Sequence, residues 1–287
     1  MTEFIQILVN GIVIGAIYSL IAVGLSLVFG VMRVINIAHG DLVMLGAYAA
    51  FFAWSALGLN PIEALIPAML VLFLIGAAIQ KALVERVVHH DEIASLMLTF
   101  GISLMIANSS DALFSTTMRG VPYLSQTITV LGITLSDAYA TGFLLSALIG
   151  LALYAFLRFS SYGKMVRATS QNPAVALACG INVQRVRVLA FGLGSALAAA
   201  AGVIVSMTGF IYPEMGTAYL PKAFCIVVLG GLGSIPGAVI AALIYGVLES
   251  LGTALLTASI APALPFVLLV IIMILRPSGI FGKTVEA

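Results

Sequence analysis

Long runs without a charged side chain alternate with short polar segments along this chain of 287 residues. An ionised residue near the centre of a bilayer costs about 2.5–3.5 kcal/mol on insertion scales, so charge-free runs of roughly 17–25 residues predict membrane-spanning helices. Eight runs fit this description: Phe4–Met32, Leu42–Ile62, Ala64–Gln80, Ile93–Ser110, Ala138–Leu157, Val188–Pro213, Ala223–Leu248 and Ser250–Leu275. Ala64–Gln80 is marginal in length and is expected to borrow residues from its flanks.

Composition agrees with this pattern, since 62% of the residues are hydrophobic, 8% are charged and the mean hydropathy is +1.21. Soluble domains carry about 25% charged residues, so the chain is expected to be an integral membrane protein. Neither the length of the runs nor their pattern suits the strands of a barrel. We therefore predict one all-α, polytopic domain over residues 1–287 with about eight membrane segments, in contact with lipid and not with nucleic acid.

The distribution of basic residues predicts the orientation. Ten of the twelve fall on one side, taken as cytoplasmic by the positive-inside rule, and Arg119 and Lys222 are the exceptions. The N-terminus is then outside the cell, the C-terminus inside, and residues 115–137 form an external loop with a small hairpin at Thr127–Val130. Two clean crossings after Lys222 would leave the C-terminus outside. One of the last segments is therefore expected to be broken or re-entrant, or Lys222 is misplaced.

Residues 158–187 form a polar, basic island that contains five of the twelve basic residues. Asn172 can cap a helix, and Pro173 suits its first position because proline lacks an N–H group. A run of small residues that includes Ala176 continues the helix, and Gly180 can close it in a left-handed conformation, with Ile181 packing back. This pattern predicts a short, ordered cytoplasmic helix on which another protein docks.

Two segments interrupt the apolar runs. Leu229–Gly237 holds four glycines and a proline, which break a helix and expose backbone groups that lipid cannot satisfy. Ile35–Gly46 places polar residues just inside a membrane segment. Inverted repeats with interrupted helices are a recurrent transporter plan, so we expect related halves, 1–115 and 138–287, with these segments in corresponding places. The residues expected near a translocation path are Asn36, His39, Gly40, Asp41, Gly230, Gly231, Gly233, Ser234, Pro236 and Gly237.

His39 and Asp41 have two interpretations. Ionisable residues in membrane segments are functional by default, as a proton relay or a substrate contact. Alternatively Asp41 caps the helix that begins near Leu42, close to the cytoplasmic edge, and we favour this second interpretation. Glu249 stands alone between two apolar runs and is expected to mark an interfacial turn.

No catalytic, cofactor or metal site is expected. The stretch Gly279–Thr284 resembles a phosphate-binding loop but has Pro277 where that pattern needs glycine. The glycines around Gly231 have the wrong spacing for a dinucleotide fingerprint. His89 and His90 are adjacent and do not converge on a metal. Cys179 and Cys225 fall in a cytoplasmic and a membrane segment, so no disulfide is expected, and no nucleophile–base pattern suggests an enzyme.

Four motifs together resemble the permease subunits of bacterial branched-chain amino acid ABC importers, and most of all the shorter of their two permeases. They are Asn36–Asp41 followed by Met44, Gly46, Ala47 and Tyr48; Gly163–Gly180 with Arg167, Ala168, Asn172, Pro173 and Ala176; Gly230–Ala238; and Pro277–Gly282. The resemblance covers nearly the whole chain. It implies an inner-membrane protein that pairs with a second, different permease, two cytoplasmic ATPases and a periplasmic binding protein, with no cofactor of its own.

The resemblance also implies that Gly163–Gly180 is the coupling loop that seats in an ATPase. Related permeases carry urea, short amides or other amino acids, so these remain alternative substrates. An ion-coupled secondary transporter would carry buried carboxylates or an unwound ion site at mid-bilayer. A channel would show rings of polar side chains along one helix face. The nearly charge-free spans favour neither.

Overall fold

The structure, a computed structural model, describes residues 2–88, 92–124, 126–130, 132–256, 263–275 and 279–281. Its elements are α1 (Thr2–Met32), α2 (His39–Leu57), α3 (Pro61–Ile79), a π-helical turn (Gln80–Val84), α4 (Glu85–Val87), α5 (Glu92–Phe114), β1 (Thr127–Val130), β2 (Ile133–Ser136), α6 (Asp137–Phe159), α7 (Ser161–Gln171), α8 (Pro173–Ala178), α9 (Val183–Thr208), α10 (Met215–Gly230), α11 (Ile235–Leu255) and α12 (Leu264–Leu275). The predictions on His89, His90, Pro277, Gly282 and Lys283 lie outside the described residues.

Within the described ranges, seven helices are long and apolar enough to cross a membrane, and α10 and α12 are shorter apolar helices. The all-helical, polytopic prediction is confirmed. Its main error is at the end of the chain, where the predicted segment Ala223–Leu248 is two helices, α10 and α11, and Ser250 belongs to α11. The marginal segment Ala64–Gln80 does borrow from its flanks, because the span extends from Pro61 to Val87 through the π-helical turn.

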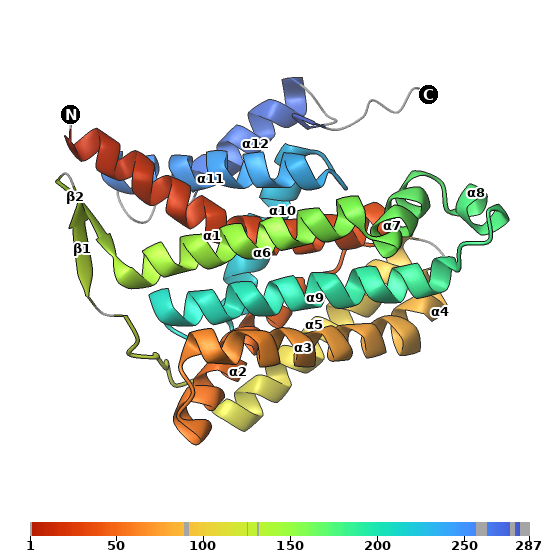
Figure 1. Cartoon of the computed structure of the whole chain (residues 1–287), viewed down its shortest axis with the longest axis horizontal. Helices are drawn as coiled ribbons and strands as arrows, with labels where there is room; N and C mark the ends of the chain where they lie inside the picture. The colour runs from red at the N-terminus through yellow and green to blue at the C-terminus, as the bar shows by residue number, and fades with distance from the viewer. Residues whose placement is uncertain are drawn as a thin grey trace.

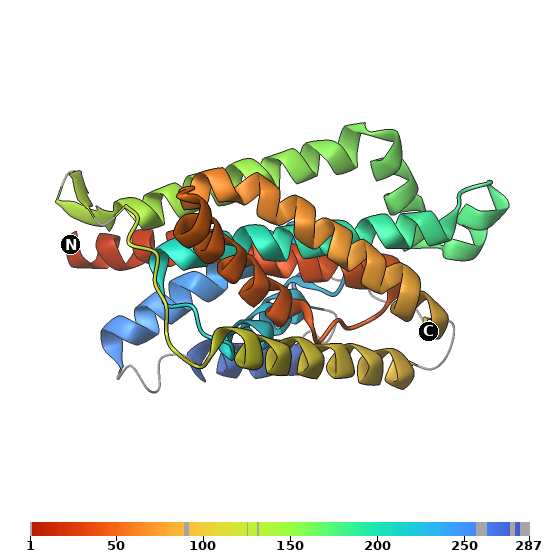
Figure 2. The same cartoon turned by 90° about the horizontal axis from the view of Figure 1, so that it is seen from below.

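The core is built around α1 and α9, which lie side by side in the middle of the bundle (Figure 1). Small residues allow this closeness: a side chain at Gly24 would meet the carbonyl oxygen of Gly194 at 2.9 Å. Ala198–Ala201 are completely buried, and Gly202 lies against the backbone of α2. Small residues of α9 therefore allow its close packing against α1 and α2. In Figure 2, α6 covers one face of this core, and α5 and α12 lie on the opposite face.

The same arrangement of helices occurs twice. A long helix (α1 or α9) is followed by a non-helical connection (33–38 or 209–214), then by a helix that begins inside the bundle (α2 or α10) and another long helix (α3 or α11). At the centre, Gly40 of α2 and Gly216 of α10 lie in such close contact that a methyl group on either would overlap the other's backbone. The expected relation between halves is thus present in the order of elements, but the predicted correspondence of segments is wrong. The counterpart of 33–38 is 209–214, whereas 231–234 corresponds to the short turn at 58–60.

The directions of the last helices agree with the expectation that one of the segments after Lys222 is broken. α11 runs antiparallel to α1, since Gly233 lies beside Gly30 and Gly246 beside Gly11. α10 and α11 are separate helices joined by the turn at 231–234. The described 279–281 stretch lies at the end of the bundle where α1 finishes, because the Ile280 N–H is bonded to Leu229 O at 2.9 Å. The N-terminal end of α1 lies at the opposite end, beside the β1–β2 hairpin (Figure 1). This antiparallel hairpin, with Thr127 paired to Ser136, confirms the one predicted in the 115–137 loop.

Candidate functional site

The polar island folds into α7 and α8, which project from one end of the bundle (Figure 1). Asn172 separates them and caps α8, because its Oδ1 accepts hydrogen bonds from the N–H groups of Ala174 (3.0 Å) and Val175 (3.1 Å). Pro173 takes the first position of the helix. Side-chain capping of this kind contributes about 1 kcal/mol, which matters for a helix of six residues. The predicted start of the helix is confirmed.

The end of α8 is also as predicted. Gly180 adopts a left-handed conformation with φ of 82°, and its N–H bonds to Leu177 O at 2.9 Å. The N–H of Ile181 returns to Ala176 O at 3.0 Å, which closes the helix in a Schellman-like turn. Capping at both ends gives α8 a fixed shape in spite of its short length.

Gly163, Arg167 and Ala168 lie on α7, which folds back against the end of α6. A side chain at Gly163 would overlap the backbone of Leu157, so only glycine allows α7 to approach this closely. The Arg167 guanidinium donates a hydrogen bond to the Leu157 carbonyl. Ser160 caps α7 by accepting from the N–H of Gly163 at 2.9 Å. Gly163 and Arg167 therefore fix the angle between α6 and α7, and Ala168 is half-buried in the same helix.

The face of α8 available for docking does not include Ala176, one of the residues of the predicted docking segment. Ala176 is 3% exposed and points into the protein, because it lies on the side of α8 that closes against the rest of the chain. The exposed side chains of α8 include Val175 and Leu177, at 57% and 65% exposure. The small-residue pattern led us to Ala176, but the burial of a six-residue helix against its own chain could not be seen from spacing alone.

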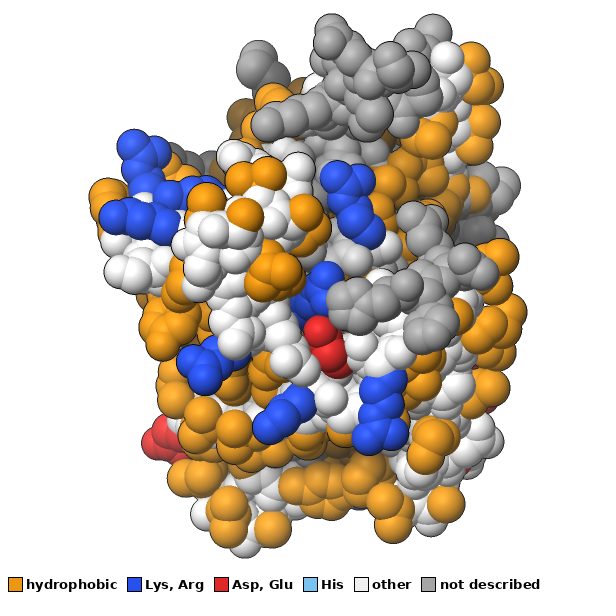
Figure 3. Space-filling view, turned by 90° about the vertical axis from the view of Figure 1, so that its right-hand side faces the viewer, with side chains coloured by type: hydrophobic (Ala, Val, Ile, Leu, Met, Phe, Trp, Pro, Cys, Tyr) orange, Lys and Arg blue, Asp and Glu red, His pale blue; other side chains and the backbone are white. Residues whose placement is uncertain are grey.

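Lys and Arg side chains gather on this end of the molecule (Figure 3). Lys164, Arg167 and Arg185 are exposed on α7 and at the start of α9. Arg187 is instead paired with Glu85, at 3.1 Å between Nη1 and Oε1, and this pair links α9 to the end of the α3 span. The end that carries α8 is thus strongly basic, with part of that charge compensated by Glu85.

The break between α10 and α11 is confirmed. α10 ends at Gly230, Gly231 and Gly233 have φ of 95° and 81°, and Ser234 caps α11 by accepting from Gly237 N–H at 3.2 Å. Pro236 lies in the first turn of α11. Gly230 and Gly237 lie in mutual backbone contact that leaves no space for a side chain. The glycines of this segment therefore serve both the left-handed turns and the close packing.

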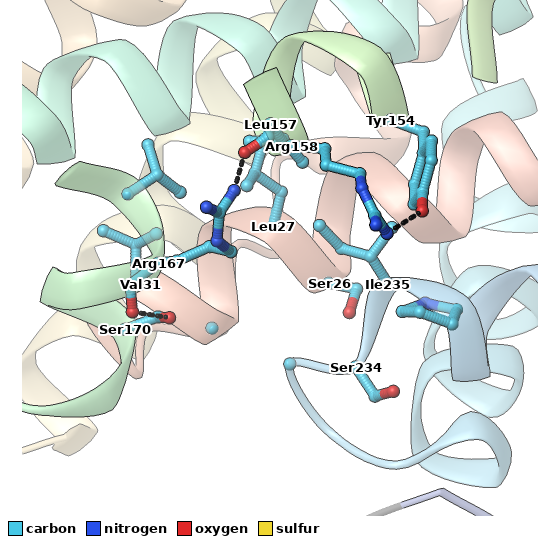
Figure 4. Close-up of a pocket in the computed structure, with 14 residues that line it drawn as sticks. Ser26, Leu27, Val31, Tyr154, Leu157, Arg158, Arg167, Ser170, Ser234 and Ile235 are labelled. Atoms are coloured by element: carbon cyan, nitrogen blue, oxygen red, sulfur yellow. Dashed lines mark hydrogen bonds between the residues drawn. The ribbon is translucent and has the colours of Figure 1, made fainter. Parts of the chain in front are cut away.

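An open cavity of about 620 Å³ lies beside the break and brings together two segments that the sequence singled out separately (Figure 4). Gly233, Ser234 and Pro236 form one wall, and Arg167 of α7 is part of the opposite wall. Residues of α1 and α6 complete the cavity, among them Ser26 and Arg158. Sequence reasoning missed Ser26, since nothing in a charge-free run marks which serine faces a cavity.

Asn36, His39, Gly40 and Asp41 are buried well inside the bundle and away from this cavity. His39 Nε2 is 2.9 Å from the carbonyl oxygen of Ile21. Ile21 lies about three helical turns before the end of α1, which is roughly 16 Å at 1.5 Å per residue. The prediction of a cap near the membrane edge is wrong: α2 begins at His39 after Ala38, no side chain caps it, and Asp41 is 3% exposed.

Lys222 and Glu249 also differ from prediction. Both lie within helices, α10 and α11, and Lys222 Nζ is 2.7 Å from Glu249 Oε1. Lys222 also donates to the hydroxyl of Tyr18 on α1 at 2.8 Å. Glu249 does not mark an interfacial turn, and Lys222, an exception to the predicted orientation, has its charge compensated by Glu249 within the bundle. A lone charge in an apolar run gives no sign of a partner 27 residues away.

The chain matches the family model described as branched-chain amino acid transport system / permease component over residues 7–275. It is 32% identical over 295 residues to the high-affinity branched-chain amino acid transport system permease protein LivH of Salmonella typhimurium, covering 98% of this chain and 96% of the relative. The corresponding protein BraD of Pseudomonas aeruginosa is 31% identical, with the same coverage.

A more distant relative is the ribose import permease protein RbsC of Escherichia coli, which is 27% identical over 82% of this chain and 74% of the relative. Among solved structures, a chain of PsaBC from Streptococcus pneumoniae in complex with Fab has the same fold, with a TM-score of 0.52, 16% identity and 97% coverage of both chains. The chain therefore belongs to the branched-chain amino acid transport system permease family, as a LivH-like membrane permease component of an ABC transporter and not an enzyme.

Proposed function

We propose that α8, held by α7, is the element through which a cytoplasmic ATPase drives this permease. As a component of an ABC transporter, the chain works with ATPase and binding-protein partners. The observation that carries the proposal is the helix itself: six residues, capped at both ends and presenting Val175 and Leu177 outward from a basic surface. An exposed apolar face on a rigid short helix suits a groove in a partner protein.

The orientation follows from the same proposal. The end with α7 and α8 is cytoplasmic, so the N-terminal end of α1 and the β1–β2 hairpin are periplasmic, and the chain returns to the cytoplasmic side after α12. The gathering of basic side chains on the α8 end supports this orientation. The two ATPases dock there, and a second, different permease completes the membrane part.

The translocation path is proposed to be lined by small and apolar side chains of α1, α2 and the helices on either side of the break. Thr217, Ala218, Pro221 and Phe224 form an exposed face of α10 that fits this description. Such a surface offers little countercharge to a zwitterionic amino acid. Substrate selection is therefore assigned to the periplasmic binding protein, with at most a weak site in the permease.

Cys179 provides the test, because it is exposed just after α8 whereas Cys225 is buried. A membrane-impermeant maleimide should label Cys179 in inside-out vesicles and leave it unlabelled in intact cells. Adding the purified ATPases to stripped vesicles should then slow the labelling at least tenfold. Labelling in intact cells would overturn the orientation, and an unchanged rate with bound ATPase would overturn docking at α8. A Cys179→Ser variant gives the background.

A further inference from the structure

The cavity beside the break lies where the outward surface of α6 changes from apolar to polar. Phe143, Leu144, Leu148 and Leu151 are exposed on α6, and no charged side chain occurs between Asp137 and Arg158. This surface suits lipid hydrocarbon. Tyr154 and Arg158 follow at the end of the helix, which is the position where aromatic and basic residues lie at the headgroup level of a bilayer.

The cavity is reached from this surface, because Tyr154 and Arg158 belong both to its lining and to the exposed side of α6. The Arg158 guanidinium donates to the Tyr154 hydroxyl at 2.7 Å, which directs it along the wall toward Ile235 and Ser26 (Figure 4). Arg167 lies across the cavity on α7, and of its five N–H donors one is bonded to the Leu157 carbonyl. Two guanidinium groups on different helices therefore belong to one cavity.

Ser26 is the observation that points to a ligand. It is completely buried, it lines the cavity, and its hydroxyl has no hydrogen-bond partner in the described part of the chain. A buried hydroxyl is normally bonded, and among the buried hydroxyls without a partner in the described residues Ser26 is one that lines this cavity, so it has a free donor for a group that enters the cavity. The N-terminal end of α11, a helix of 21 residues, also meets the cavity at Ser234 and Ile235 and adds a partial positive charge.

We propose that this cavity binds the phosphate headgroup of an anionic phospholipid, whose acyl chains lie along the exposed apolar surface of α6. The headgroup accepts hydrogen bonds from Arg158, Arg167 and the Ser26 hydroxyl. The apolar lining, which includes Leu27, Val31 and Ile235, accommodates the glycerol and upper acyl carbons. Basic pockets between membrane helices are suited to anionic headgroups. The site is independent of the orientation proposed above, since both leaflets contain anionic lipid.

The lipid would join α6 and α7 to the first turn of α11. The cavity walls come from α7 and from the break, and α1 packs against both α7 and α11. A bound headgroup therefore holds the angle between α7 and the bundle, and its loss is expected to loosen α7 without removing α8.

The test measures lipid binding to the delipidated full-length permease by native mass spectrometry. Three probes are used: phosphatidylglycerol, phosphatidylcholine with the same acyl chains, and inorganic phosphate. Wild-type protein should bind one phosphatidylglycerol saturably and at least tenfold more tightly than phosphatidylcholine. Arg158→Gln and Ser26→Ala should each weaken phosphatidylglycerol about tenfold. Lys164→Gln, which changes an exposed basic residue of α7 outside the cavity, should leave binding unchanged.

Size-exclusion profiles and thermal midpoints of the variants show whether they fold. If Arg158→Gln does not fold, Ser26→Ala still tests the proposal. Equal binding of the two lipids, or unchanged binding in both cavity variants, would overturn the proposal. Inorganic phosphate that displaces phosphatidylglycerol at equal concentration would overturn the lipid as the ligand and leave a site for a free anion.

Discussion

Lys222 and Glu249 form an ion pair of 2.7 Å between α10 and α11, the two helices on either side of the 231–234 break. Their side chains are 21% and 15% exposed, so the pair lies largely within the bundle. Tyr18 of α1 joins it through a hydrogen bond from Lys222, and its ring lies 5.8 Å from that of Tyr245. The pair therefore links the interiors of α10 and α11 to each other and, through Tyr18, to α1.

We expect Lys222→Met to destabilise the permease, by less than the about 3–5 kcal/mol found for fully buried pairs, because the Glu249 carboxylate is left without its counter-ion and is only 15% exposed. The thermal midpoint in detergent should fall by several degrees. The double variant Lys222→Met/Glu249→Leu should regain most of the loss, since an apolar pair of similar volume needs no charge compensation. If the double variant is less stable than both single variants, the charges act on something other than each other.

The contact between Gly230 and Gly237 predicts a second effect. A methyl group at Gly237 would overlap the Gly230 carbonyl oxygen, so Gly237→Ala should separate the ends of α10 and α11 and lower both folded yield and transport. Gly150→Ala is the matched control, because Gly150 is also helical and has no atom near its missing side chain. The control should be neutral or slightly stabilising. Equal thermal midpoints for the two variants would show that the contact is not tight.

His39 is expected to hold α2 to α1 and not to carry protons. His39→Gln can still donate to the Ile21 carbonyl oxygen and should keep at least half of the folded yield and transport. His39→Ala should lose most of its folded protein, because it leaves a cavity in the buried contact between α1 and α2 and removes the hydrogen bond to Ile21 O. Fluorescence-detected size exclusion and uptake assays measure both quantities. Folded but inactive His39→Gln would support the relay interpretation instead.

Sequence reasoning succeeded where local chemistry decides the structure. The apolar runs predicted most helices, and the Asn172, Pro173 and Gly180 pattern predicted both ends of α8, because capping depends on neighbours in the chain. It failed where a long-range contact decides. The depth of His39, the burial of Ala176 and the pairing of Lys222 with Glu249 all depend on which helices meet, and one-dimensional spacing does not contain that information.

Placing selectivity in the binding protein predicts that the purified permease pair, without that protein, has no micromolar site for leucine. Calorimetric titration should show no saturable heat below about 1 mM. A site of micromolar strength, worth about 8 kcal/mol, would place the choice of substrate in the membrane part.

The coupling role of α8 is tested most directly by ATP-driven uptake of radiolabelled leucine into proteoliposomes that hold the complete transporter. Leu177→Arg puts a charge on the exposed face of α8, whereas Gln184→Arg puts the same charge on the exposed first turn of α9. At equal amounts of inserted permease, we predict that Leu177→Arg lowers uptake at least tenfold and that Gln184→Arg stays near wild type. Wild-type uptake by Leu177→Arg would contradict the assignment of α8 as the coupling element.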